Sequence, residues 1–346
     1  MKQIKWTLLL WAVMGVCASC ETVIDLSELN DYNVGDIVIN GIVSPDSLFT
    51  AYISKAYSSP DAPFIALREY DDEGFWVPSE YWDSHRYNFD ALKMYAQCTA
   101  SVQLLVNDRD EYSMAYDSTT YMYHSNYRPQ EGDHVLLKVT NDDGEVATAE
   151  TTVLPSQKLD ILEYEVKYEN LSIESNNNEW LVALPGDTAV YLKLRLTDPG
   201  NEENFYRLKV RNLRKYNTDG DKEYYNCQEL FKSDDVIFKD NRLVRGWGGW
   251  SAYFSNVFDD HLFNGKEYTF ELKTSLYPIG DTTYKRYLII ELQSMPKDYY
   301  YYLKSMLLYR ITLDSDFAES SYLHSNVENG WGFLGSLNGE KHIIEL

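Results

Sequence analysis

Two runs of alternating apolar and polar side chains, Val135–Thr140 and Val146–Thr152, flank the sequence Asn141-Asp142-Asp143-Gly144. Alternation with a period of two is typical of a β-strand with one buried face. An Asp-Gly pair between two such runs is a strong signal for a β-hairpin, because both residues accept the backbone conformations that a tight turn requires. Residues 135–152 therefore predict an antiparallel hairpin.

The same pattern precedes this hairpin. Runs rich in Val, Ile, Tyr and Thr are separated by turn residues such as Ser44-Pro45-Asp46. The expected strands are Asp36–Val43, Phe49–Tyr57 and Ala100–Val106. Short strands without a helical period predict an immunoglobulin-like β-sandwich over residues 36–155, which ends at Pro155.

An irregular insert interrupts this sandwich near residues 62–95 and is dense in aromatic and acidic side chains. A loop of this length in a compact domain is usually functional or disordered, and the aromatic content argues against disorder. Trp76, Tyr81 and Trp82 are therefore candidates for binding a ligand or a partner, since flat rings give a large contact area at low entropic cost. The alternative is that these rings pack over the edges of the sandwich.

A second β pattern covers residues 156–346 and predicts a second β-rich domain. The expected strands are Val190–Leu196, Phe205–Leu213, Val236–Phe238, Tyr268–Leu272 and Tyr287–Leu292. One helix is expected near 296–310, because Ser294 suits the N-cap and Pro296 suits the first turn. A glycine-rich turn is expected over Asn329–Gly335.

A second aromatic cluster lies on a glycine frame within this domain, in the sequence Gly246-Trp247-Gly248-Gly249-Trp250. Trp247 and Tyr253 are further candidates for binding a ligand or a partner, with packing against the domain as the alternative.

The N-terminus is typical of a bacterial lipoprotein. Lys2 and Lys5 precede an apolar run from Thr7 to Val16, and Ala18-Ser19-Cys20 follows. This order predicts a cleaved secretion signal over residues 1–19, and the apolar run is too short for a membrane span. Cys20 is the expected site of lipidation, and residues 20–35 form an acidic tether.

Composition excludes some partners. The chain has 54 acidic and 31 basic side chains, a formal net charge of −23. A strongly acidic surface disfavours nucleic acid and anionic membranes, so attachment to the membrane is expected through lipid alone. Cys98 and Cys227 lie far apart, and two buried free thiols are favoured over a disulfide.

Motifs of known catalytic chemistry are missing from the sequence. It contains no metalloprotease, nucleophile-elbow, phosphate-loop or dinucleotide signature, and its six histidines are scattered. Asn217-Thr218-Asp219-Gly220-Asp221 has oxygen ligands at alternate positions, but its glycine is misplaced for a calcium loop. We therefore expect no enzyme activity, no metal and no cofactor.

Several segments together resemble a family of Bacteroidota outer-membrane lipoproteins that is known as domain of unknown function four-two-four-nine. The matching segments are Ile39–Asp46, Thr197-Asp198-Pro199, Asn204-Phe205-Tyr206, Ser233-Asp234-Asp235, Phe258-Asp259-Asp260, Phe263-Asn264-Gly265 and Ser325–Gly335. Their order and spacing cover nearly the whole mature chain. The resemblance implies an immunoglobulin-like sandwich followed by a β-rich domain, encoded beside TonB-dependent receptors.

The resemblance also implies a surface location and a modification. Acidic residues after the lipid cysteine accompany surface export in this phylum, and Glu21 and Asp25 match this in part. An O-glycosylation signal of such bacteria is similar to the sequences at Ser47, Ser118, Thr188 and Thr282, although Asp-Ser and Asp-Thr are also common turn pairs.

The sequence thus favours a non-catalytic accessory of the outer membrane, which binds a glycan, a small nutrient or a TonB-dependent receptor. A structural or adhesive surface protein is the first alternative. A glycan-active enzyme is the second alternative, since paired carboxylates could serve a glycosidase. With 54 acidic side chains, close pairs also arise by chance, so the sequence singles out no pair.

Replacing Cys20 tests the anchor. We expect Cys20→Ser to abolish incorporation of labelled palmitate and to release the protein from the membrane fraction, because the diacyl anchor needs the thiol. Cys17→Ser is the control and should keep the label, because large Val16 precedes Cys17. Labelling that depends on Cys17 instead would contradict the assignment.

Overall fold

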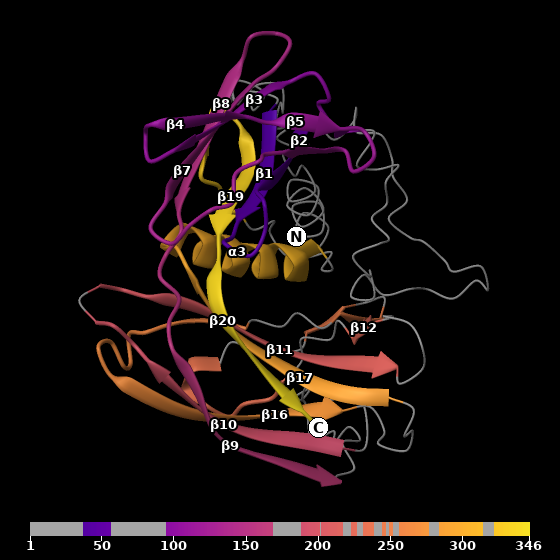
Figure 1. Ribbon diagram of the computed structural model, residues 1–346, viewed down its shortest axis with the longest axis vertical. Coiled ribbons are helices and arrows are strands. Elements are labelled where there is room, and N and C mark those ends of the chain that lie inside the picture. Colours follow the sequence, from indigo (N-terminus) through magenta and orange to yellow (C-terminus); the bar gives the residue numbers. More distant parts are fainter. Residues whose placement is uncertain are drawn as a thin grey trace, which may run out of the picture. The chain divides into compact units, whose positions relative to one another are not determined.

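The computed structural model describes residues 37–56, 95–168, 188–200, 202–216, 223–226, 231–238, 244–246, 249–251, 256–276, 284–313 and 322–346. These residues form strands with a single α-helix, so the prediction of a β-rich chain with one helix is confirmed (Figure 1). The helix α3 spans Lys297–Leu313, close to the expected range.

Two five-stranded sheets form the first group of strands. One has the order β19-β1-β2-β6-β5 and the other has the order β18-β8-β7-β3-β4. The bounds are β1 Ile37–Val43, β2 Thr50–Lys55, β3 Ser101–Val106, β4 Asp110–Ser113, β5 Ala115–Asp117, β6 Met122–His124, β7 His134–Thr140, β8 Val146–Thr152, β18 Val327–Glu328 and β19 Trp331–Ser336.

The predicted hairpin is β7–β8, and it shows how alternation builds the core of this group. Val135, Leu137 and Val139 are completely buried, while Lys138 between them is exposed. They join one hydrophobic cluster with residues of both sheets. The side chain of Asn141 closes the turn by accepting hydrogen bonds from two backbone N–H groups of the turn, at 3.1 and 2.9 Å.

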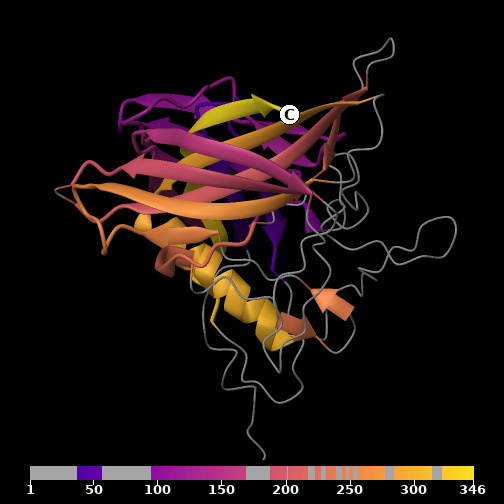
Figure 2. The same cartoon turned by 90° about the horizontal axis from the view of Figure 1, so that it is seen from below.

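The second group of strands has its own core. One sheet has the order β16-β10-β9 and the other the order β12-β11-β17-β20, with β15 also pairing with β11. The bounds are β9 Leu159–Tyr168, β10 Thr188–Thr197, β11 Phe205–Tyr216, β12 Glu223–Asn226, β15 Val257–Asp259, β16 Glu267–Leu276, β17 Tyr284–Met295 and β20 Asn338–Glu345; a separate pair is β13 Val244–Gly246 with β14 Gly249–Ser251. Figure 2 shows these strands as long twisted ribbons, with the C-terminus at the end of β20.

Residues 236–238 differ from the sequence prediction. They form a short 3₁₀ helix, η3, instead of a strand. The carboxylate of Asp235 accepts the backbone N–H of Ile237 at 3.1 Å, which satisfies a donor at the start of this helical turn. The alternation of three residues was too short to separate a strand from one helical turn.

The segment Asn329–Gly335 also differs, because most of it is the strand β19 and not a turn. This strand pairs in parallel with β1, and Figure 1 shows the two side by side. At Gly332 the φ angle is +95°, and an added methyl group would overlap the carbonyl oxygen of Ile39 in β1. The glycines thus allow a close approach of two backbones, which is a known use of glycine inside a strand.

β19 also connects the two groups of strands. Residues 327–336 lie within the expected second domain of 156–346, but they pair with β1 and β8 of the first group. Only Leu337 separates β19 from β20, which belongs to the second group. Hydrogen bonds from Ser336 to the carbonyl of Thr152 at 2.6 Å and from Asn338 to that of Leu154 at 2.9 Å fix this crossing.

A third cluster of buried residues joins α3 to β19. The ring of Phe333 stacks on Tyr302, with centroids 4.4 Å apart, and on Tyr299, with centroids 5.5 Å apart. Phe205 of β11 and Met295 of β17 belong to the same cluster. The neighbouring Leu334 points into the first core instead. Successive residues of β19 therefore serve two different cores.

Gly332→Ala tests the close approach of β19 to β1. We expect it to lower the free energy of unfolding by more than about 3 kcal/mol, because the methyl group forces the two strands apart. Gly144→Ala is the matched control: its φ is +82° but no atom lies within 4 Å of the added carbon, so only about 1 kcal/mol of backbone strain is expected. Equal losses in chemical denaturation would contradict the proposed contact.

Candidate functional site

Most of the predicted binding residues lie outside the described residues. This holds for Cys20, for the aromatic candidates Trp76, Tyr81, Trp82, Trp247 and Tyr253, and for Thr282. Ser47 and Ser118 are exposed, whereas Thr188 is completely buried at the start of β10. A buried hydroxyl is a poor acceptor for a glycan on the folded chain. Cys98 is also exposed, so the prediction of a buried thiol is wrong at this position, and Cys227 lies outside the described residues.

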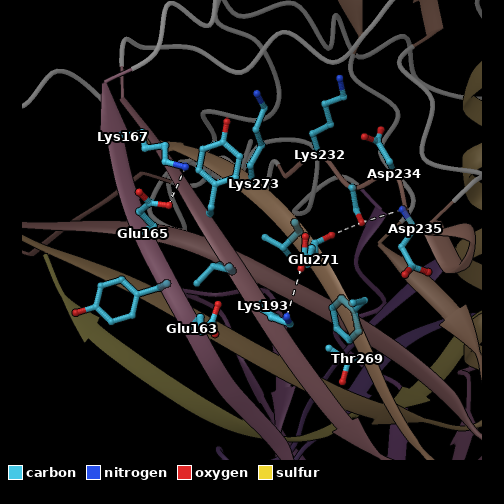
Figure 3. A pocket seen from close by; sticks show the side chains of 16 residues that line it. Glu163, Glu165, Lys167, Lys193, Lys232, Asp234, Asp235, Thr269, Glu271 and Lys273 are labelled. Atoms are coloured by element: carbon cyan, nitrogen blue, oxygen red, sulfur yellow. Dashed lines mark hydrogen bonds and ion pairs between the residues drawn. The ribbon is translucent and has the colours of Figure 1, made fainter.

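A groove with a volume of about 1050 Å³ crosses the outer face of the sheet β16-β10-β9 (Figure 3). Its floor is formed by these three strands, and residues 232–235 form one wall. Most of its side chains are polar or charged. None of the residues singled out for binding in the sequence lines it.

The register of the strands arranges the groove in rows. One row runs from Glu165 of β9 through Tyr191 of β10 and Lys273 of β16 to Lys232, since each residue is paired with the next. The ammonium group of Lys273 lies 5.6 Å from the centroid of the Tyr191 ring. Lys167 lies 4.8 Å from the same centroid and pairs with Glu165 at 2.7 Å. Three lysines thus gather at this end of the groove, which we call the lysine end.

The next row is acidic. Glu163 of β9, Lys193 of β10 and Glu271 of β16 are paired across the sheet. Lys193 approaches Glu271 at 3.7 Å. Figure 3 shows exposed Asp234 at the other end of the groove, beside Lys232. We call the row of Glu163, Lys193 and Glu271 the acidic end, and the groove therefore changes the sign of its charge along its length.

The wall of the groove is held firmly. Phe231 and Phe238 are buried in the second core on either side of it. Ser233 donates a hydrogen bond to the carbonyl of Glu271 at 2.5 Å, and Tyr268 donates one to the carboxylate of Asp235 at 2.8 Å. Burial, together with this bond, raises the pKa of Tyr268 to about 12. A wall fixed from both ends keeps the charged groups in place without a ligand.

The sequence contained one signal for this wall. Ser233-Asp234-Asp235 is among the segments that carry the family resemblance, but its partners on β9, β10 and β16 are distant in sequence. Ser233 and Asp235 have structural hydrogen bonds, whereas Asp234 is exposed in the groove.

Four other segments of the resemblance meet at a buried carboxylate cluster. The carboxylate of Asp198 accepts hydrogen bonds from the Tyr206 hydroxyl at 2.5 Å and from the backbone N–H of Gly265 at 2.7 Å. The pKa of Tyr206 is raised mainly by burial and, second, by the hydrogen bond of its hydroxyl to Asp198. Gly200 packs directly on the backbone of Gly265, and a Cβ added at position 200 would lie only 2.7 Å from the Cα of Gly265.

Asp260 lies in the same cluster and is only 1% exposed. One carboxylate oxygen accepts the backbone and side-chain N–H groups of Asn204, both at 3.0 Å. The other oxygen is buried and has no hydrogen-bond partner among the residues that the structure describes. Burial raises the pKa of Asp260, and the charge of Asp198 adds to this. In the described part of the chain, no group of three or more His, Cys, Asp or Glu side chains could hold a metal ion. Through these hydrogen bonds the cluster connects four segments of the chain.

The segments of the resemblance therefore occupy defined places in one fold, and the family model of a domain of unknown function, DUF4249, matches residues 27–342. The chain belongs to the DUF4249 family. A DUF4249 chain is defined by this shared sequence pattern and not by an activity.

Other comparisons add little. Comparison with curated proteins gives no match. A solved structure from Corynebacterium diphtheriae, described as a candidate membrane-anchored protein, is similar at 10% identity and a TM-score of 0.19, over 75% of this chain and 54% of its own. The match thus spans about half of that protein, and a likeness of this extent carries no functional information. Among the described residues, no helix has the length and apolar character to cross a membrane.

Two substitutions separate the roles of the buried carboxylates. We expect Asp198→Asn to lower the free energy of unfolding by about 1–3 kcal/mol at pH 7, because a neutral amide weakens its charge-assisted hydrogen bonds. Asp260→Asn should be neutral or stabilising at pH 7, because it removes a buried charge with one unsatisfied oxygen.

The pH dependence provides the control. Burying the charged carboxylate of Asp260 costs stability. Because the pKa of Asp260 is raised, the carboxylate is neutral at low pH and this cost is absent; the cost appears as the pH rises through the folded-state pKa. Any advantage of Asp260→Asn should therefore shrink on acidification. A large loss of stability in Asp260→Asn at pH 7, measured by urea denaturation, would refute this assignment.

Proposed function

We propose that this protein is a lipid-anchored accessory on the outer face of the outer membrane of a Bacteroidota bacterium. In this proposal it binds a ligand or partner without transforming it, and works with a TonB-dependent receptor in the uptake of a nutrient. The lipoprotein signal at Cys20 and the family implied by the sequence support the location and the partner.

The observation that carries a binding function is the groove over β16-β10-β9. It is large enough for a small molecule, and its charged groups are fixed by strand register and by a pinned wall. Preorganised polar groups on a rigid sheet suit recognition, because little conformational entropy is lost when a ligand binds. The groove is open and polar, which suits a hydrophilic ligand better than an apolar one.

A receptor partner is tested by purifying the tagged, lipidated protein from membranes solubilised in mild detergent. We expect one TonB-dependent receptor to be recovered in near-equal amount by mass spectrometry, because a working accessory remains bound to its transporter. The Cys20→Ser protein, which lacks the anchor, is the control and should recover less receptor. Deletion of the gene should slow growth on the nutrient concerned.

Other results point elsewhere. Recovery of the protein alone, with unchanged growth on every nutrient, would contradict the accessory function. Self-association or binding to matrix would then favour an adhesive surface protein, and turnover of a polysaccharide would favour a glycan-active enzyme.

A further inference from the structure

The strand β9 is the edge of its sheet and is exposed on both faces. Among the described residues it pairs with β10 alone, and Figure 1 shows it as the outermost strand of this sheet. All residues from Leu162 to Lys167 are exposed. A long edge of this kind presents a row of backbone N–H and C=O groups with which another strand can pair.

The core-facing side of β9 continues past the core as an apolar row. Tyr164 pairs with Leu192 of β10 and Val166 pairs with Val190, and both residues of β10 are buried. Tyr164 itself is 51% exposed and Val166 is 40% exposed. Apolar side chains that lie in line with a core but are exposed to water gain free energy when a partner covers them.

The edge strand β20 in the other sheet of this group has a different pattern. Its exposed apolar residue Ile343 is accompanied by Glu340 and Lys341, which are also exposed. Successive residues of a strand point to opposite faces, so both faces of β20 carry a charge. Charges of this kind discourage pairing with another chain. The exposed part of β9 has all its charges on the groove face and none on the apolar face.

The charges on the groove face of β9 are self-complementary in an antiparallel pair. If two copies pair about Glu165, Glu163 of each copy lies opposite Lys167 of the other. On the apolar face, Tyr164 of each copy then lies opposite Val166 of the other. The two Glu165 side chains meet at the axis, but each pairs with Lys167 of its own chain at 2.7 Å. Pairing about Tyr164 would instead set Glu163 against Glu165 twice, which is unfavourable.

We propose that β9 is a dimer interface, at which a second copy of this chain pairs antiparallel about Glu165. The sheets β16-β10-β9 of the two copies then form one continuous sheet. Because the two-fold axis is perpendicular to this sheet, the two grooves open on the same face. The proposal goes beyond the function proposed above, since the pairing requires neither a ligand nor a receptor.

A disulfide at the proposed axis tests the register. Directly opposite residues of antiparallel strands have Cα atoms about 4.5–5.5 Å apart, which suits a disulfide. We expect Glu165→Cys in the full-length, lipidated protein to give a cross-linked dimer on mild oxidation, read by non-reducing electrophoresis. Exposed Cys98 is first replaced by serine, and this parent protein should not cross-link. Glu111→Cys on the edge strand β4 is the matched control and should cross-link far less.

Substitutions on the apolar face test the same contact without oxidation. Sedimentation of the full-length protein in density-matched detergent should show a dimer that forms with rising concentration. Val166→Lys should weaken dimerisation at least about tenfold, because symmetry places the new charge in the interface twice. Ile343→Lys on β20 places the same charge at a residue that is 65% exposed, and should change dimerisation less than about twofold. Both variants should keep the melting temperature of the natural chain, because both side chains are exposed.

Any of three results would overturn the proposal. These are a protein that stays monomeric up to about 100 μM, equal cross-linking of Glu165→Cys and Glu111→Cys, or equal effects of Val166→Lys and Ile343→Lys. Recovery of a receptor in the purification experiment is read separately from these measurements. Failure of the dimer alone would therefore leave the accessory function in place, whereas loss of the receptor alone would leave the dimer.

Discussion

The parallel pairing of β19 with β1 is the contact on which the remaining structure depends. β19 lies near the end of the chain, between α3 and β20, yet it completes a sheet whose other strands come from residues 37–124. Leu334 enters the first core while its neighbour Phe333 stacks on helix α3. Gly332 permits this insertion because its neighbour is the backbone of β1. One short strand thus contributes Leu334 to the first core and Phe333 to the cluster that includes α3.

The sheet that forms the floor of the candidate groove is connected to β19 through the second core. The sheet β16-β10-β9 shares its core with β11 and β17, and β17 pairs with β20, the strand that continues β19. The charged rows of the groove therefore lie on strands that pack on the second core, and a ligand meets groups that strand pairing holds in place. A polar groove whose charged groups are held by strand pairing suits a hydrophilic ligand better than an apolar one.

The sequence predicted those features that depend on local pattern. The hairpin β7–β8 follows from alternation and the Asn141–Gly144 turn. Helix α3 lies close to its expected range, but the expected N-cap Ser294 is wrong, because Ser294 lies inside β17 and the helix begins at Lys297. Elsewhere, one prediction was wrong and one feature was missed, because in each case the deciding contact is distant in sequence. The glycines of β19 indicated a turn, whereas in the structure they allow the backbone of β19 to lie close to the backbone of β1. The groove was missed because Lys232 and Lys273 become neighbours only through a bridge between separate segments. The aromatic candidates of the insert lie outside the described residues and stay predictions.

Hydrogen exchange of the full-length protein, read by mass spectrometry in increasing denaturant, tests most directly whether β19 joins the two cores. We expect that amides of β1 in the first core and of β17 in the second open together, with free energies that agree within about 1 kcal/mol. If β1 opened at a much lower free energy while β17 stayed protected, the two cores would be independent. The central place given to the β19–β1 pair would then be wrong.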